Sequence, residues 1–88
     1  MTYRVAILPA AQRDLAGLPP RDRKRIDERI LSLATNPRPP GVEALQGQRG
    51  FLRLRVGDYR VIYQVRDEVL LVLVVKVGHR REVYRNLP

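Results

Sequence analysis

The chain has 88 residues, 17 of them Lys or Arg against 9 Asp or Glu, and a formal net charge of +8. This length fits one domain with a single core, and the absence of cysteine excludes disulfides and thiolate metal sites. One histidine is too few for the common His-based metal sites, so we expect no bound metal.

The chain shows no sequence signal for a membrane or for secretion. Its longest apolar run, residues 69–75, is far shorter than the ~20 residues that a membrane helix needs. The N-terminus lacks a basic segment followed by a long apolar stretch, which a secretory signal requires. We therefore expect a cytoplasmic protein that does not bind membranes.

Positive charge is the strongest global feature. Fifteen of the 17 basic residues are arginine, and the excess is spread over both halves of the chain. A folded basic surface of this kind attracts polyanions, either nucleic acid or an acidic protein. The alternative interpretation is a small basic protein whose charge serves only solubility.

The first half of the chain predicts a strand and two helices. Alternating apolar residues indicate a strand over residues 2–8, and prolines open two helices over residues 10–18 and 20–35. A connector rich in Pro and Gly, residues 36–47, contains too many breakers for a strand. The second helix should bury one apolar stripe, made of Ile26, Ile30, Leu31, Leu33 and Ala34.

Residues 51–65 predict a β-hairpin. Two alternating segments flank Gly57-Asp58, and glycine in first place suits a type II′ turn. This turn sets Arg55 opposite Arg60, with Arg53 on the same face and no acidic residue of the two strands between them. The other face should be buried; it comprises Leu52, Leu54, Val56, Tyr59, Val61, Tyr63 and Val65.

Residues 69–77 complete the expected fold. Their apolar run predicts a central strand covered on both sides, after a turn at residues 66–68. The resulting order, β-α-α-β-β-β, indicates an α+β domain with a small, mostly antiparallel sheet and two helices on one face. The opposite face, with its arginines, should form a concave basic patch.

The inventory of reactive side chains excludes several enzyme classes. Ser32 is the only serine, no carboxylates are paired for acid–base work, and no P-loop or dinucleotide fingerprint is present. Arginine, one histidine and four tyrosines remain. This set suits cleavage of RNA by its own 2′-hydroxyl, in which the protein stabilises phosphate charge and moves two protons. No cofactor is implied.

Each candidate residue also has a simpler interpretation. Arg60 is a phosphate ligand or an ordinary exposed arginine, and the same choice applies to Arg53 and Arg55. Tyr84 is a site residue or an aromatic lid over the core. His79, at the end of the apolar strand, is structural or a titrating group beside the arginines.

Two motifs, GDYRVIY at residues 57–63 and GHRREVY at residues 78–84, resemble the RelE branch of the RelE/ParE toxins of toxin–antitoxin modules. The resemblance implies a microbial ribonuclease-like α+β fold and metal-free cleavage of mRNA in the ribosomal A site. It also implies a RelB-like antitoxin that blocks the toxin, with operator DNA bound only through the antitoxin complex.

By this resemblance, Arg60 corresponds to the family's phosphate-stabilising arginine, and Arg80 or Arg81 to the arginine of the second motif. Tyr84 corresponds to the tyrosine that activates the 2′-hydroxyl or stacks on the substrate. Arg53 and Phe51 replace two family lysines; an arginine stabilises charge but is a poor proton shuttle. His79 is then a candidate for proton transfer, and the expected RNA-binding residues are Arg55, Arg81, Arg49 and Lys76.

Two alternatives to the RelE interpretation stay open. A ParE-type protein would poison DNA gyrase without catalysis, and a degenerate toxin would act only as an antitoxin-bound corepressor. The set of arginines and tyrosine favours the RelE interpretation, whereas the absence of the two family lysines leaves the corepressor alternative open. The apolar helix stripe and the basic surface predict an amphipathic, acidic antitoxin segment as the partner.

Overall fold

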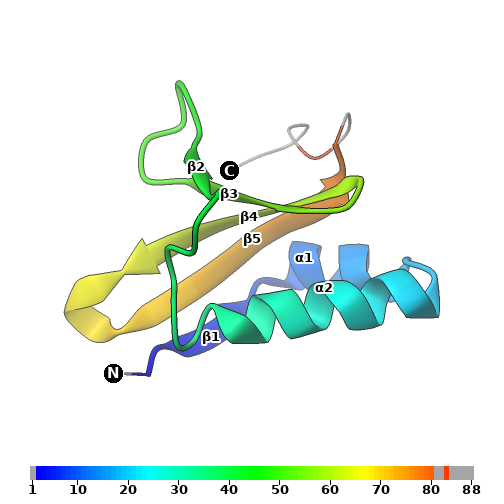
Figure 1. Cartoon of the computed structure of the whole chain (residues 1–88), viewed down its shortest axis with the longest axis horizontal. Helices are drawn as coiled ribbons and strands as arrows, with labels where there is room; N and C mark the ends of the chain where they lie inside the picture. The colour runs from blue at the N-terminus through cyan, green and yellow to red at the C-terminus, as the bar shows by residue number, and fades with distance from the viewer. Residues whose placement is uncertain (1, 81–82, 84–88) are drawn as a thin grey trace.

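The computed structural model describes residues 2–80 and residue 83, and across these residues two helices cover one face of a five-stranded sheet (Figure 1). The α+β class and the predicted order of the main elements are confirmed. The elements are β1 (Arg4–Ile7), α1 (Pro9–Ala16), α2 (Pro20–Ser32), β2 (Glu43–Ala44), β3 (Leu52–Val56), β4 (Tyr59–Arg66), the short 3₁₀ helix η1 (Asp67–Val69) and β5 (Leu71–His79).

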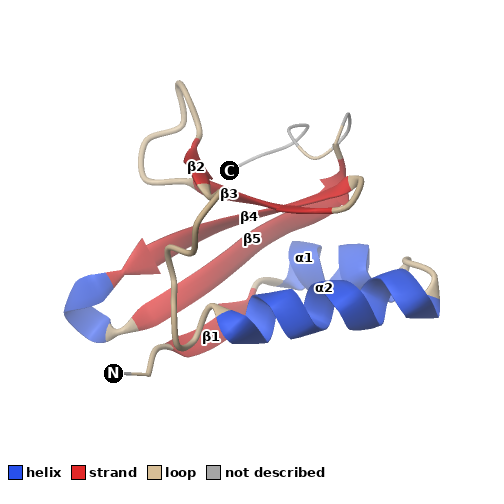
Figure 2. Ribbon diagram, in the orientation of Figure 1, coloured by secondary structure: helices blue, strands red, loops and turns tan. Residues whose placement is uncertain are grey.

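The strand order in the sheet is β1-β5-β4-β3-β2. Only β1 runs parallel to its neighbour, with Arg4 opposite Leu71, and the other described strand pairs are antiparallel. The parallel pair needs a crossover, which α1 and α2 supply along one face of the sheet (Figure 2). The expected mostly antiparallel sheet is therefore confirmed.

Both helices begin at a proline, where the missing N–H costs no hydrogen bond. Ala11 and Leu15 of α1 are buried against the sheet, as are Ile26 and Ile30 of α2. The prediction that Leu31 belongs to the buried stripe is wrong, because its side chain is 66% exposed. Leu31 follows Ile30 by one residue, which is about 100° around a helix of 3.6 residues per turn.

The β3–β4 hairpin has the predicted register. Arg55 lies opposite Arg60, Leu54 opposite Val61 and Arg53 opposite Ile62. Gly57 has φ 60°, and Asp58 is not among the described residues with positive φ. This is the pattern that a type II′ turn requires. The predicted buried face is confirmed, since its residues all belong to or pack against the main core.

Tyr63 is the largest fully buried side chain of the core. Its hydroxyl donates a hydrogen bond to the Pro37 carbonyl at 2.7 Å, so the polar end is satisfied. Burial raises the pKa of Tyr63 to about 12, although the nearby Arg38 opposes this shift. The bond also fastens the connector after α2 to the sheet.

The prediction is wrong at the connector and at the central strand. The sequence predicts no strand in the connector, yet Glu43–Ala44 pairs with β3 as an edge strand. The central strand begins at Leu71 and not at residue 69, because η1 occupies Asp67–Val69 and ends at Leu70 in a left-handed conformation with φ 51°. Val69 is consequently 56% exposed.

A network of polar side chains joins η1 to the start of β1 and to the connector. The Arg38 guanidinium donates to both carboxylate oxygens of Asp67, at 3.1 and 2.8 Å, and the Tyr3 hydroxyl donates at 2.6 Å. The Arg38 hydrogen bonds, followed by that of Tyr3, lower the pKa of Asp67 to about 2. The same contact raises the pKa of Tyr3.

The sheet face opposite the helices is only partly open, because a small apolar cluster covers some of it. Ile62, Val75 and Val83 are buried there. They pack against four partly buried side chains, Leu8, Leu45, Phe51 and Leu73. Phe51 thus covers the sheet, and Val83 fastens the chain after β5 to this face, where its N–H also donates to the His79 carbonyl at 3.0 Å.

Candidate functional site

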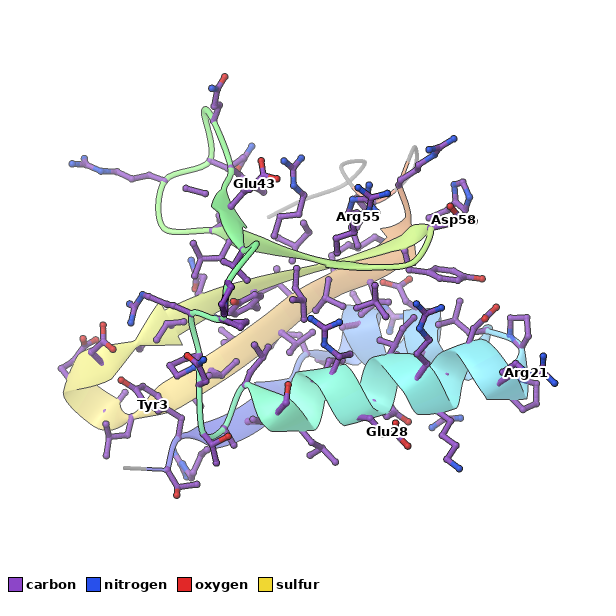
Figure 3. The ribbon with its side chains drawn as sticks, viewed as in Figure 1. Tyr3, Arg21, Glu28, Glu43, Arg55 and Asp58 are labelled. Atoms are coloured by element: carbon purple, nitrogen blue, oxygen red, sulfur yellow. The ribbon has the colours of Figure 1, made fainter. Side chains whose placement is uncertain are left out.

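Arg53, Arg55 and Arg60 lie on the sheet face that the helices do not cover, which we call the arginine face. Cross-strand pairing sets Arg55 beside Arg60 and puts Arg53 next to the apolar cluster at Ile62. Figure 3 shows Arg55 and Glu43 on the side of the sheet away from α2. A row of guanidinium groups on one face can contact successive phosphate oxygens of an RNA strand.

Arg60 is held by the carbonyl groups of its own hairpin. Its Nη1 donates to the Gly57 carbonyl at 3.3 Å and to the Tyr59 carbonyl at 3.1 Å. Gly57 presents its carbonyl there because the turn gives this residue a positive φ, which glycine adopts without strain. The half-buried guanidinium is therefore oriented before any ligand arrives.

Arg53 forms an ion pair that the sequence did not reveal. Its Nη2 lies 2.7 Å from Oε2 of Glu43 on the neighbouring strand β2, with side-chain exposures of 29% for Arg53 and 67% for Glu43. Sequence reasoning misses Glu43 because the prolines and glycines of the connector argue against a strand there. No local signal marks this strand, because two residues are too few to show a periodicity.

A cavity of about 430 Å³ lies beside this ion pair. Glu43 and Arg55 both line it, together with Arg29 of α2, and the flanking glycines are Gly41 and Gly57. The volume falls within the ~300–1,000 Å³ that is typical of small-molecule sites. The charged side chains of this lining are Arg29, Glu43 and Arg55, so it is suited to a polar, charged ligand.

Arg80 reaches the same end of the sheet through its backbone. Its N–H donates to the Asp58 carbonyl at 2.9 Å, and its side chain is exposed. The Gly57-Asp58 turn therefore contacts both Arg60 and Arg80. The two further candidates of this segment, Arg81 and Tyr84, lie outside the described residues.

His79 does not share the arginine face. It lies opposite Tyr59 in the β4–β5 pairing, and the two rings meet edge to face with centroids 6.2 Å apart. Both line a cavity of about 350 Å³ with Asp22 and Arg25 of α2, on the helix side of the sheet. The Tyr59 hydroxyl donates to Asp22 at 3.1 Å; partial burial and then this bond raise the pKa of Tyr59.

The remaining predicted RNA-binding residues are dispersed. Lys76 pairs with Asp14 of α1 at 3.4 Å, and the same carboxylate accepts the Val77 N–H at 3.1 Å. Asp14 thus covers the edge of β5 beyond the end of β1. Arg49 is exposed in the loop between β2 and β3.

The described residues contain no group of three or more His, Asp or Glu side chains placed to hold a metal ion. Within the same residues, neither helix has the length and apolar content needed to cross a bilayer.

Comparison with known proteins identifies the family. The family model described as the ParE toxin of the type II toxin–antitoxin system parDE matches residues 5–84. The chain is 34% identical to the toxin RelG of Mycobacterium tuberculosis over 87 residues, which cover 98% of this chain and 100% of the relative. It is 33% identical to the toxin RelE of the same organism, covering 98% of this chain and 90% of that relative.

Solved structures of toxins from the same family have a similar fold. The RelBE2 toxin–antitoxin complex of M. tuberculosis contains a chain with a TM-score of 0.80 and 31% identity, covering 91% of this chain and 100% of that one. A chain of the archaeal RelE–RelB complex from Pyrococcus horikoshii matches with a TM-score of 0.80 and 33% identity, covering 94% and 100%. The protein belongs to the RelE/ParE toxin family of type II toxin–antitoxin systems, and the relatives named here are RelE-type toxins.

Proposed function

We propose that this toxin is a ribosome-dependent endoribonuclease, which cuts mRNA in the A site by metal-free attack of the substrate's 2′-hydroxyl and so inhibits translation. The observation that carries the proposal is the arginine face, with Arg60 already oriented by the carbonyl groups of Gly57 and Tyr59. Preorganised cations aimed at developing charge are usually the largest single contribution to catalysis.

The roles follow from the reaction. The RNA supplies its own nucleophile, so the protein has to hold the ribose and the phosphate in line and stabilise the dianionic phosphorane. Arg60 takes the phosphorane charge, since its guanidinium is fixed at the hairpin. Arg53 and Arg55 contact flanking phosphates, and Arg80 adds a second cation at the turn. By its resemblance, Tyr84 orients the 2′-hydroxyl.

The partner is proposed to be a RelB-like antitoxin with an acidic segment. Two of the solved structures that resemble this chain are complexes: one is the RelBE2 toxin–antitoxin complex, and the other is a RelE–RelB complex. The net charge of +8 favours an acidic partner that covers the arginine face and excludes mRNA from it. Operator DNA would be bound only through that complex, in the cytoplasm.

The test is primer extension on a defined mRNA in a purified translation system, with and without the toxin. We expect cuts only when ribosomes are present, and only inside A-site codons. Arg60→Ala should lower the cleavage rate about 10²–10³-fold, which is typical of removing one charge-stabilising donor. Arg21→Ala is the matched control, because it removes one arginine from the start of α2, away from the arginine face (Figure 3).

Intact mRNA with wild-type toxin would refute the proposal. Inhibition of gyrase supercoiling would then support a ParE-type activity, which the description of the matching family model favours. The protein would be a corepressor if it neither cuts mRNA nor inhibits gyrase. In that case its antitoxin complex should bind operator DNA equally tightly with wild-type toxin and with Arg60→Ala.

A further inference from the structure

The cavity on the helix side of the sheet lies between the start of α2 and the β3–β4 turn, and we call it the turn cavity. Figure 3 shows Asp58 of the turn at the end of the molecule where α2 begins, at Arg21. The volume of about 350 Å³ is at the lower end of the ~300–1,000 Å³ typical of small-molecule sites. The lining residues are Asp22, Arg25, Ile26, Val56, Gly57, Asp58, Tyr59 and His79. The proposed cleavage reaction uses none of these side chains.

Two opposite charges of the turn cavity have no partner within the described residues. Three atoms of the Arg25 guanidinium, Nη1, Cζ and Nη2, lie 3.1, 3.5 and 3.6 Å from the position that a Cβ on Gly57 would occupy. Neither this guanidinium nor the exposed Asp58 carboxylate is in an ion pair of the described residues. By contrast, the Asp22 carboxylate accepts the Tyr59 hydroxyl. The cavity therefore offers one cation and one carboxylate to a ligand.

The aromatic rings of the cavity suit a flat ligand. Tyr59 and His79 meet with ring centroids 6.2 Å apart and an angle of 80° between their planes. Because the rings are nearly perpendicular, a planar ligand can stack on one of them and contact the edge of the other. His79 is exposed, so a ligand can reach this pair from solvent. Ile26 and Val56, both buried, supply the apolar part of the lining.

This combination of groups matches a guanine nucleotide. Proteins recognise an unpaired nucleobase by stacking on aromatic side chains and by hydrogen bonds to its Watson–Crick edge. Guanine has two adjacent donors on this edge, N1–H and the N2 amino group, and a carboxylate has two oxygens that accept. Adenine has a donor beside an acceptor there, so it cannot pair with a carboxylate in this way. A guanidinium binds phosphate oxygens through its parallel N–H donors.

We propose that the turn cavity binds a guanosine 5′-phosphate, with the base between Asp58 and the Tyr59–His79 pair and the phosphate on Arg25. This site is separate from the arginine face, and it does not depend on the proposed ribonuclease function. The ligand is a free nucleotide or a guanosine within an RNA strand, because both carry the same base and phosphate.

The experiment titrates the purified toxin with guanosine 5′-monophosphate (GMP) and follows binding by calorimetry and by the ring signals of His79 in NMR spectra. His79 is the only histidine of the chain, so its signals report on this cavity alone. We expect GMP to shift these signals. It should bind about 5–150-fold more tightly than adenosine 5′-monophosphate (AMP), which is the discrimination that one good bidentate contact to a base gives.

Two variants separate the two contacts. Asp58→Asn should lose the preference for GMP over AMP, because an amide presents one acceptor and one donor group. The Asp58 carbonyl that accepts the Arg80 N–H is unchanged in this variant. Arg25→Ala should bind GMP no more tightly than guanosine without a phosphate. Asp27→Asn and Arg23→Ala are the matched controls, since each removes one member of an exposed ion pair on the same helix, and both should bind GMP like wild type.

A single-stranded RNA with one guanosine among uridines distinguishes the two sources of the ligand. A His79 shift that depends on Asp58 with this RNA and not with GMP assigns the site to a guanosine of RNA. The same shift with GMP shows that the site takes a free nucleotide.

Three results would overturn the inference. The first is that neither probe binds more tightly than its adenosine counterpart. The second is a preference for guanosine that Asp58→Asn leaves intact. The third is binding that leaves the His79 signals unmoved, which would place the ligand outside the turn cavity.

Discussion

Replacing Gly57 by alanine tests whether the hairpin turn holds the arginine face together. Gly57 has φ 60°, a conformation that costs an L-residue with a Cβ about 1–2 kcal/mol. An added Cβ would also meet Nη1 of Arg25 at 3.1 Å. That atom is the far end of a flexible side chain and can move, so the backbone term decides the outcome.

Gly17→Ala is the matched control. Gly17 ends α1 with φ −85°, and a Cβ there would meet only the Asp14 and Arg13 carbonyl oxygens, at 3.7 and 3.8 Å. Both substitutions reduce the entropy of the unfolded chain equally, by about 0.4–1 kcal/mol. The difference between the two variants therefore isolates the strain at Gly57. We expect Gly57→Ala to be less stable than Gly17→Ala by about 1–2 kcal/mol.

The assay is thermal and urea unfolding followed by circular dichroism. For a domain of this size the difference corresponds to roughly 5–15 °C in Tm, and m-values should be unchanged. Equal stability of the two variants would refute the assignment of strain to Gly57. Because the Gly57 carbonyl accepts a bond from Arg60, Gly57→Ala should also slow RNA cleavage at temperatures where the variant is fully folded.

Two further predictions concern the connector and η1. Tyr63→Phe leaves the Pro37 carbonyl without its buried donor and should lower the free energy of unfolding by about 1–2 kcal/mol in urea titrations; no change would contradict the role of that bond. Asp67→Asn removes a carboxylate whose pKa the Arg38 and Tyr3 bonds lower to about 2. Its stabilising effect is complete above about pH 4, the unfolded value, and is lost as the pH falls toward 2. The variant should thus lose less stability than wild type between these pH values, and an equal loss would contradict the argument.

The hairpin was predictable because its information is local. A two-residue turn with glycine first fixes the register, and alternation then assigns every side chain to a face. Arg55 and Arg60 are opposed in the structure as the sequence indicates. The three arginines of the arginine face were therefore available from the sequence alone.

Strand β2 was not predictable in this way, because tertiary pairing holds it. It has two residues, and its partners on β3 are Leu52 and Arg53. The loop that returns the chain to β3 depends on Gly47 and Gly50, both with positive φ. No periodicity extends over so short a segment, so the position of Glu43 on the arginine face required the structure.

The placement of His79 shows what a boundary error does. The sequence predicts that the central strand ends at Val77, which would leave His79 in a loop free to approach the arginines. The strand continues to His79 instead. Since side chains alternate, His79 follows Val77 to the helix side, where Val77 is buried in the main core and His79 meets Tyr59.

The same charges that form the candidate site also protect the register on which it depends. A slip of one residue between β3 and β4 would turn one strand's residues to the opposite face. On β3 that would move Arg53 and Arg55 into the space that Leu54 and Val56 fill against the helices. Each buried, unpaired guanidinium costs several kcal/mol, so two would remove most of the ~5–15 kcal/mol by which a domain is stable. The arginines that suit this face to RNA therefore also disfavour a mispaired register. Neutral substitutions at these positions should weaken both RNA binding and the preference for the native register.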